Sequence, residues 1–321
     1  MLEVCDLFLE FKTSRGRLLA LNGISFNVHP GEVFGLVGET GCGKTVTGLS
    51  ILRLLPRSAS ITHGKIIFEG TDLLTMTQSE IEAVRGNKIA MIFQDPSASL
   101  NPVFTVGSQI ERVIRQHTKA TARQATDKAL EVLAAVGLPD VKRILGSYPH
   151  QLSGGMQQRV MIAMAISCNP RLLIADEPTT ALDVTIQAQI LKLLGDLQKK
   201  FDISIIFITH NLGVIANTCD RLAVLYAGRL VESGATSDIF NQPHHPYTQG
   251  LMNAIPHPGS RGKRMAAIPG AVPSNPGALT GCPFAPRCEF SVQRCQQERP
   301  PLFPIGANHL SACFLAGQKI C

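Results

Sequence analysis

Val33-Phe-Gly-Leu-Val-Gly-Glu-Thr-Gly-Cys-Gly-Lys-Thr45 joins a short apolar run to a glycine-rich turn that ends in lysine and threonine. Residues 38–45 fit G-x-x-x-x-G-K-[ST], whose glycines let backbone N–H groups curl around phosphate oxygens at a helix N-terminus. In such a loop Lys44 reaches the β and γ phosphates, and the Thr45 hydroxyl coordinates Mg²⁺. An ordinary glycine turn is the alternative interpretation. The predicted nucleotide loop, expected to bind a nucleotide with Mg²⁺, comprises Gly38, Glu39, Thr40, Gly41, Cys42, Gly43, Lys44 and Thr45.

A second apolar run ends in two acidic residues, Leu172-Leu-Ile-Ala-Asp176-Glu177. Phosphate loops of this kind work with an acid at the tip of a buried strand, which holds the Mg²⁺ shell. We expect Asp176 to take that role, and Glu177 to polarise the attacking water as a general base. The alternative is a buried strand that ends in a solvated Asp-Glu turn.

The chain from Met1 to about Phe240 alternates short apolar runs with longer helical patterns. This alternation predicts an α/β fold, in which helices cover a largely parallel sheet. The expected strands are 33–37, 88–93, 172–175 and 204–209, and the expected helices are 45–55, 123–136, 155–167 and 184–200. The last helix carries an apolar stripe of Ile186, Ile190, Leu193, Leu194 and Leu197.

Composition and charge narrow the classes of protein that fit the 321-residue chain. Its hydrophobic content of 45% is ample for a buried core. The apolar runs are far shorter than the ~20 residues that cross a bilayer. The N-terminus shows no signal-peptide pattern, so we expect a cytosolic protein. The formal net charge of +6 suits nucleic acid or an anionic membrane surface, but acids and bases are interspersed without a long Lys/Arg run, so charge alone decides nothing. We expect no nucleic-acid partner.

The composition changes beyond Phe240, where 12 of the chain's 20 prolines lie between Asn241 and Leu310. Such a density breaks helices and central strands. We therefore expect one domain over residues 1–240 and an extension over residues 241–321. The extension holds five of the nine cysteines, whose clustering in a reducing cytosol indicates metal ligation or a coincidence of inert thiols.

The segment Leu152-Ser-Gly-Gly-Met-Gln-Gln-Arg159 precedes the acidic strand and begins a helical pattern. Ser153, with the amides of Gly154 and Gly155, offers a second anion site at a helix N-terminus, and a plain helix cap is the alternative. Together with the nucleotide loop, this segment resembles the ABC ATPases. The resemblance implies a P-loop ABC ATPase domain with a RecA-like core and a helical subdomain. It also implies that the serine site closes on the ATP of an opposing subunit, so that hydrolysis requires a dimer.

Other motifs of the resembled family follow in order along the chain. Gln94 matches the Q-loop glutamine that touches Mg²⁺ or water and relays the nucleotide state to the permease. Asp183 matches the D-loop, which acts across the dimer, and His210 matches the switch histidine that contacts the γ-phosphate. Taken singly, Gln94 and His210 also fit ordinary polar residues at strand ends. Phe11 lies where the family places an aromatic ring against adenine, although a core phenylalanine fits equally.

Three less common segments resemble the dipeptide and oligopeptide importers among the ABC ATPases. They are Met91-Ile-Phe-Gln-Asp-Pro-Ser-Ala-Ser-Leu-Asn-Pro102, Tyr148-Pro-His-Gln-Leu-Ser-Gly-Gly-Met156 and His245-Pro-Tyr-Thr-Gln-Gly-Leu-Met252. The proline-flanked pair His244 and His245 is interpreted as a turn that folds the tail, with a metal site as the alternative. The resemblance implies ATP hydrolysis that drives peptide uptake, with nickel, glutathione or an antimicrobial peptide as alternative cargo.

The same resemblance implies partners and a place in the cell. The expected partners are a second, related ATPase subunit, two transmembrane permease subunits and an extracytoplasmic peptide-binding protein. The expected location is the cytoplasmic face of the bacterial inner membrane. An ABC ATPase that acts on ribosomes or DNA is the rival interpretation, but it generally carries two cassettes or a coiled-coil insertion, and this sequence has neither.

Four cysteines of the extension, Cys282, Cys288, Cys295 and Cys313, lack the C-x-x-C spacing of most zinc ribbons. Four thiolates can hold a [4Fe-4S] cluster, and members of the resembled subfamily carry such a tail. Zinc and unligated thiols remain alternatives, and the terminal Cys321 is left out of the set. A sensor ATPase whose cluster reports redox state is a further alternative.

In the nucleotide loop, Lys44 and the helix N-terminus are expected to lower the pKa of the Cys42 thiol and to make it reactive.

Overall fold

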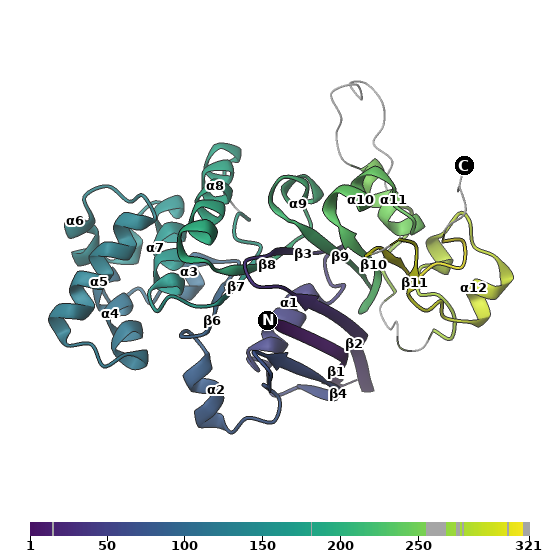
Figure 1. Cartoon of the computed structure of the whole chain (residues 1–321), viewed down its shortest axis with the longest axis horizontal. Helices are drawn as coiled ribbons and strands as arrows, with labels where there is room; N and C mark the ends of the chain where they lie inside the picture. The colour runs from purple at the N-terminus through teal and green to yellow at the C-terminus, as the bar shows by residue number, and fades with distance from the viewer. Residues whose placement is uncertain are drawn as a thin grey trace. The chain divides into compact units, whose positions relative to one another are not determined.

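The computed structural model describes residues 1–14, 16–180, 182–254, 268–273, 277, 279–306 and 308–316. The chain divides into two compact units (Figure 1). The first unit contains Met1–His29, Val33–Thr75 and Ile208–Cys321, and the second contains Pro30–Glu32 and Met76–Phe207. The terminal Cys321 lies outside the described residues.

The first unit holds two groups of strands. One is an antiparallel sheet in the order β2-β1-β4-β5, and the other runs in the order β11-β12-β10-β9-β3. Strand β3 pairs with β9 in parallel, whereas β9, β10, β12 and β11 pair antiparallel. The strands are β1 (Leu2–Thr13), β2 (Gly16–Val28), β3 (Val33–Val37), β4 (Ala59–Phe68), β5 (Thr71–Asp72), β9 (Arg221–Tyr226), β10 (Arg229–Ala235), β11 (Phe303–Pro304) and β12 (Leu310–Ser311).

Five α-helices and one 3-10 helix belong to the described part of the first unit. They are α1 (Lys44–Ile51), α9 (Leu212–Thr218), α10 (Thr236–Asn241), α11 (Pro246–Asn253), η3 (Ala285–Arg287) and α12 (Gln293–Gln297). Helix α9 packs on β3, where Ile215 lies close to Gly35. Apart from Val33, the apolar residues of β3 and β9 are buried, because both strands lie inside the sheet.

The second unit combines parallel strands with a helical bundle. Strand β6 (Ile89–Ile92) pairs in parallel with β7 (Leu172–Asp176), and β8 (Ser204–Thr209) neighbours β7 and crosses the boundary between the units. Helices α4, α5, α6 and α7 pack on one another. The helices are α2 (Gln78–Val84), α3 (Pro96–Ser99), α4 (Val106–His117), α5 (Ala122–Ala135), α6 (Val141–Gly146), η1 (Pro149–Gln151), α7 (Gly154–Ile166) and α8 (Val184–Phe201).

The predicted elements correspond closely to the observed ones. Strands β3 and β8 have the predicted bounds, and α5, α7 and α8 begin and end within one residue of them. The α/β fold class is confirmed. Helix α1 is the exception, because it ends at Ile51 instead of residue 55. Arg53 adopts a left-handed conformation with φ 51°, and Pro56 disfavours helix at the residue before it.

The described parts of the C-terminal extension pack within the first unit. Strand β12 pairs with β10, and the buried carboxylate of Glu232 on β10 joins two other segments. It accepts hydrogen bonds from the backbone N–H groups of His244 (2.7 Å) and His245 (3.0 Å), and it lies 2.7 Å from Nε2 of His309. These contacts hold the chain that leads into α11, of which His245 is the extended N-cap residue, and the interpretation of the two histidines as a turn stays a prediction. The domain boundary near Phe240 stays a prediction.

None of the helices in the described ranges combines the length and apolar character needed to span a bilayer.

The burial of His245 predicts a pH-dependent stability. Burial lowers the pKa of His245 to about 4, with the charge of Glu232 acting weakly in the opposite direction. Between about pH 6.5 and pH 4 the unfolded chain therefore binds a proton that the folded chain excludes. We expect stability to be full above pH 6.5 and to fall by about 3 kcal/mol towards pH 4.

Thermal melts between pH 4 and pH 7 measure this effect. His245→Asn keeps an acceptor for the backbone N–H of Tyr247, which His245 Nδ1 accepts at 3.1 Å in the native chain. We expect this variant to have a flatter dependence of melting temperature on pH. His29→Asn, at an exposed histidine of the same unit, is the control. Parallel curves for His245→Asn and the wild type would contradict the assignment.

Candidate active site

The predicted nucleotide loop lies between β3 and α1, and two of its positions require glycine. Gly38 has φ 153°, and a Cβ atom there would overlap the carbonyl oxygen of Leu225 on β9. Gly43 has φ 111° and precedes α1, where a Cβ atom would meet the side chain of Leu21. A side chain at either position would strain the backbone or displace a neighbour. The loop can therefore lie directly against the end of β9.

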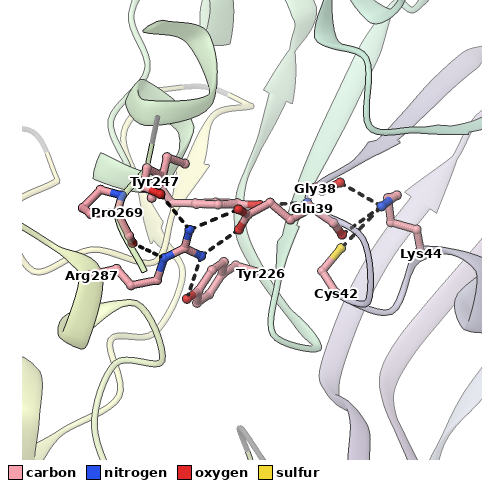
Figure 2. A network of polar contacts seen from close by, with 9 residues as sticks. Gly38, Glu39, Cys42, Lys44, Tyr226, Tyr247, Pro269 and Arg287 are labelled. Atoms are coloured by element: carbon pink, nitrogen blue, oxygen red, sulfur yellow. Dashed lines mark hydrogen bonds and ion pairs between the residues drawn. The ribbon is translucent and has the colours of Figure 1, made fainter. Parts of the chain in front are cut away.

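The ammonium group of Lys44 bridges this loop from inside (Figure 2). Its Nζ atom donates to the carbonyl oxygens of Gly38 (2.8 Å) and Glu39 (3.0 Å), and the residue is 5% exposed. Thr45, in the first turn of α1, is exposed. A lysine held among carbonyl groups can exchange these partners for phosphate oxygens, which accept from it more strongly because they are charged.

The structure corrects the prediction for Cys42. The residue is 1% exposed, and burial raises the pKa of its thiol despite the opposing effect of Lys44. The Cys42 sulfur lies 3.8 Å from Lys44 Nζ, inside the loop. A buried thiol with a raised pKa is poorly nucleophilic, so the expected reactivity is wrong.

In the second unit, the acidic pair follows β7 as predicted. Asp176 ends the strand and is 3% exposed. Glu177 adopts a left-handed conformation with φ 46°. Its Oε2 atom accepts hydrogen bonds from Nε2 of Gln94 (3.3 Å) and from Oγ1 of Thr180 (2.8 Å). The structure thus brings Gln94 and Glu177 together, and two neutral donors orient the carboxylate of the predicted general base.

Two further predicted residues of the second unit are helix caps. The side chain of Ser153 accepts from the backbone N–H of Met156 (3.4 Å) at the start of α7. Asp183 accepts from the N–H of Ile186 (2.9 Å) at the start of α8. Gly154 and Gly155 form the first turn of α7, and a Cβ atom on Gly155 would lie 3.1 Å from the Ile186 side chain. Within the single chain, Ser153 and Asp183 therefore act as helix N-caps.

The remaining predicted residues of the site lie in the first unit. His210 follows β8 and is exposed, next to Asn211, which caps α9. Phe11 lies near the end of β1, where it pairs with Leu18 of β2 and Ala59 of β4, and it is partly buried. These placements leave the adenine contact of Phe11 a prediction.

The four cysteines predicted to act together line one cavity. Cys282, Cys288, Cys295 and Cys313 surround a space of about 20 Å³, together with aromatic residues that include Phe284, Phe290 and Phe314. Burial raises the pKa values of Cys282 and Cys288, and that of Cys313 to about 11. As the chain stands, no three His, Cys, Asp or Glu side chains in the described ranges are arranged to hold a metal ion.

Family models match most of the chain. One described as "ABC transporter" matches residues 21–180, and one described as "Oligopeptide/dipeptide transporter, C-terminal region" matches residues 231–295. A probable peptide ABC transporter ATP-binding protein of Sinorhizobium fredii is 50% identical, and the alignment covers 100% of this chain and 96% of the relative. The chain belongs to the ABC transporter ATP-binding proteins, in the oligopeptide and dipeptide importer subfamily.

Other members of this subfamily are similarly related. The oligopeptide transport ATP-binding protein OppD of Bacillus subtilis is 48% identical over 98% of this chain and 88% of the relative. The dipeptide transport ATP-binding protein DppD of the same species is 46% identical over 99% of this chain and 96% of the relative. As an ABC ATPase, the chain couples ATP hydrolysis to transport.

Solved ABC cassettes share the fold. The dimeric cassette MJ0796, in a post-hydrolysis state with ADP and Pi, is 26% identical with a TM-score of 0.66, and it covers 74% of this chain and 99% of that one. The cassette cbiO1 of Clostridium perfringens is 28% identical with a TM-score of 0.65, covering 75% and 90%.

Sequence reasoning missed four residues that contact the predicted site. Thr180 donates to Glu177, Tyr247 and Arg287 bind Glu39 of the nucleotide loop, and Tyr226 contacts Arg287 beside them. Tyr247 lies in a segment singled out for its resemblance to the subfamily, but no local pattern connects it with the loop. The partner of Arg287 is 248 residues away in the sequence, so neither spacing nor periodicity could identify the pair.

The burial of Cys42 predicts slow alkylation. We expect Cys42 in the native chain to react with a maleimide at least about tenfold more slowly than in the denatured chain, because little thiolate is exposed. Mass spectrometry of peptides from quenched samples measures each cysteine separately. Cys5, which is half-buried, serves as the internal control. Native labelling of Cys42 as fast as that of Cys5 would show that the loop is open.

Proposed function

We propose that this chain hydrolyses ATP to drive the uptake of dipeptides and oligopeptides across the bacterial inner membrane. The observation that carries the proposal is the joint match of both parts of the chain. The ATPase segment and the C-terminal segment each match their own model, and relatives with peptide-import names align over nearly the whole chain. The chain is the ATPase subunit of the importer.

The proposed chemistry assigns a role to each group of residues. The nucleotide loop holds the phosphates through its N–H groups and Lys44, while Thr45, Asp176 and Gln94 supply oxygen ligands for Mg²⁺. Bound Mg²⁺ neutralises charge on the phosphate oxygens. Glu177 takes a proton from the attacking water, and its hydrogen bonds from Gln94 and Thr180 keep the carboxylate oriented. His210 is assigned to the γ-phosphate.

We further propose that two such subunits close around two ATP molecules. Ser153, Gly154 and Gly155 then bind the phosphates of the partner's nucleotide, and Asp183 acts across the same interface. The solved relative MJ0796 is dimeric, which supports this arrangement. The proposed partners are a second related ATPase subunit, two permease subunits and an extracytoplasmic peptide-binding protein. The chain then works on the cytoplasmic face of the membrane as a peripheral subunit.

Glu177→Gln tests the proposed base. The amide keeps the size of the side chain but accepts a proton poorly, so we expect hydrolysis by the reconstituted transporter to fall about a hundredfold or more. Binding of Mg-ATP is expected to persist. Phosphate release and nucleotide binding are measured on the same preparation. Glu131→Gln, at an exposed glutamate of the same unit, is the matched control. Turnover by Glu177→Gln at the wild-type rate would exclude Glu177 as the base.

Uptake assays test the cargo. A bacterial strain that lacks the chain is expected to lose import of di-, tri- or longer peptides, and the wild-type gene is expected to restore it. Glu177→Gln is expected not to restore it. Unchanged peptide uptake with lost uptake of nickel or glutathione would assign the alternative cargo.

We propose that the four cysteines of the extension hold a [4Fe-4S] cluster. The donor set fits, because four soft thiolates facing an apolar, aromatic-lined cavity are the ligands that iron–sulfur clusters and zinc require. No three of the described side chains are arranged to hold a metal ion as they stand, so the thiolates would have to shift position to take a cluster. Cys282, Cys288, Cys295 and Cys313 would hold it, and it would supply a cross-link between their segments.

Metal analysis of anaerobically purified protein tests this assignment. We expect iron and acid-labile sulfide in equal amounts, with a broad visible absorption that Cys288→Ser diminishes. Cys168→Ser, at a half-buried cysteine outside the cavity, is the control. Stoichiometric zinc without sulfide would assign the alternative ion, and the absence of both would assign inert thiols.

A further inference from the structure

The guanidinium group of Arg287 lies against the nucleotide loop. Its Nη1 and Nη2 atoms bind the carboxylate of Glu39 as a fork, at 2.7 Å from Oε2 and 3.1 Å from Oε1 (Figure 2). The side chain of Arg287 is 4% exposed, and that of Glu39 is 30% exposed. Such a two-pronged, charge-assisted contact fixes both groups in direction as well as in distance.

The remaining contacts of Arg287 leave it little freedom. Its Nε atom donates to the carbonyl oxygen of Pro269 (2.8 Å), Nη2 also donates to that of Ile268 (3.3 Å), and Nη1 lies 3.4 Å from the hydroxyl of Tyr226. Its guanidinium carbon also lies over the ring of Tyr226, 5.7 Å from the ring centroid. A lysine has neither the fork nor the flat face, so it cannot reproduce this set of contacts.

Glu39 itself is held from three sides. Its carboxylate binds Arg287, its backbone N–H donates to the hydroxyl of Tyr247 (2.9 Å), and its carbonyl oxygen accepts from Lys44. Tyr247 is fully buried, and its ring packs on Tyr226 with centroids 4.6 Å apart. Tyr247 and Arg287, both in the extension, therefore fix the second position of the nucleotide loop together with Lys44.

The position of Arg287 connects the loop with the cysteine cavity. Arg287 ends the helix η3, and the next residue, Cys288, lines the cavity. The backbone N–H of Arg287 donates to the carbonyl oxygen of Phe284, whose ring also lines the cavity. The turn between Cys282 and Cys288 thus sets where the guanidinium group lies.

The charge of Glu39 explains why the loop needs this contact. A carboxylate in a loop that binds phosphates repels them unless a cation neutralises it. Arg287 supplies that charge from behind the loop, and it holds the carboxylate in place. We propose that Arg287 is a positioning residue through which the cysteine-bearing extension sets the affinity of the nucleotide loop for Mg²⁺-bound nucleotide. This inference rests on the proposed role of the loop as the phosphate site.

Binding of Mg-ADP to the full chain, measured by calorimetry, tests the inference without turnover. We expect Arg287→Met to bind Mg-ADP about tenfold more weakly, since it loses a charge-assisted fork and leaves Glu39 unneutralised. Because Arg287 acts through Glu39, the same substitution in a Glu39→Gln background is expected to weaken binding less than about twofold. The matched control is Arg294→Met, at an exposed arginine of the extension that pairs with Glu298.

Further variants separate the possible failures. If Lys44→Ala loses binding while Arg287→Met binds normally, the inference is wrong and the loop assignment stands. If Lys44→Ala also binds normally, the proposed role of the loop is itself wrong. Equal weakening by Arg287→Met in both backgrounds would show that Arg287 acts independently of Glu39, which also overturns the inference.

A second measurement applies if Arg287→Met does not fold. Glu39→Gln removes the ion pair from the loop side, so we expect maleimide to label Cys42 severalfold faster in the folded protein. Arg294→Met is expected to leave the labelling rate as in the wild type. Unchanged labelling of Cys42 in Glu39→Gln would overturn the inference.

Discussion

The contact between the nucleotide loop and the end of β9 is the constraint on which the first unit depends. Gly38 lies so close to the carbonyl oxygen of Leu225 that no larger residue fits there. The next residue of β9, Tyr226, contacts Arg287 and Tyr247. Close approach at one glycine therefore places the loop, the strand and the C-terminal extension in one packed cluster (Figure 2).

The second unit holds the carboxylate of Glu177, the predicted general base, through two hydrogen bonds. Asp176 is buried at the tip of β7, and the left-handed conformation of Glu177 turns the chain away from the strand. Gln94, which follows the neighbouring strand β6, then reaches Glu177, because parallel strands end at the same edge of a sheet. The proximity of Gln94 and Glu177 is thus a consequence of strand pairing.

The extension makes direct contacts with the sheet and with the nucleotide loop. Its strand β12 adds to the sheet at β10, its histidine His309 contacts the buried Glu232, and its Arg287 binds the nucleotide loop. A buried carboxylate is costly unless charged or polar partners surround it, so Glu232 stabilises the docked tail only while those partners stay in place. The cysteine cavity lies within the same docked region.

The sequence by itself determined the α/β class, the nucleotide loop, the acidic strand and the approximate bounds of most of the eight elements that were predicted, because glycine geometry, apolar periodicity and capping residues act over a few positions. Only the tertiary structure decided that Arg287 binds Glu39, that four cysteines share one cavity, and that burial raises the pKa of Cys42. These features depend on segments far apart in the chain and on exclusion of water. Local sequence patterns contain no information about contacts between distant segments or about the exclusion of water.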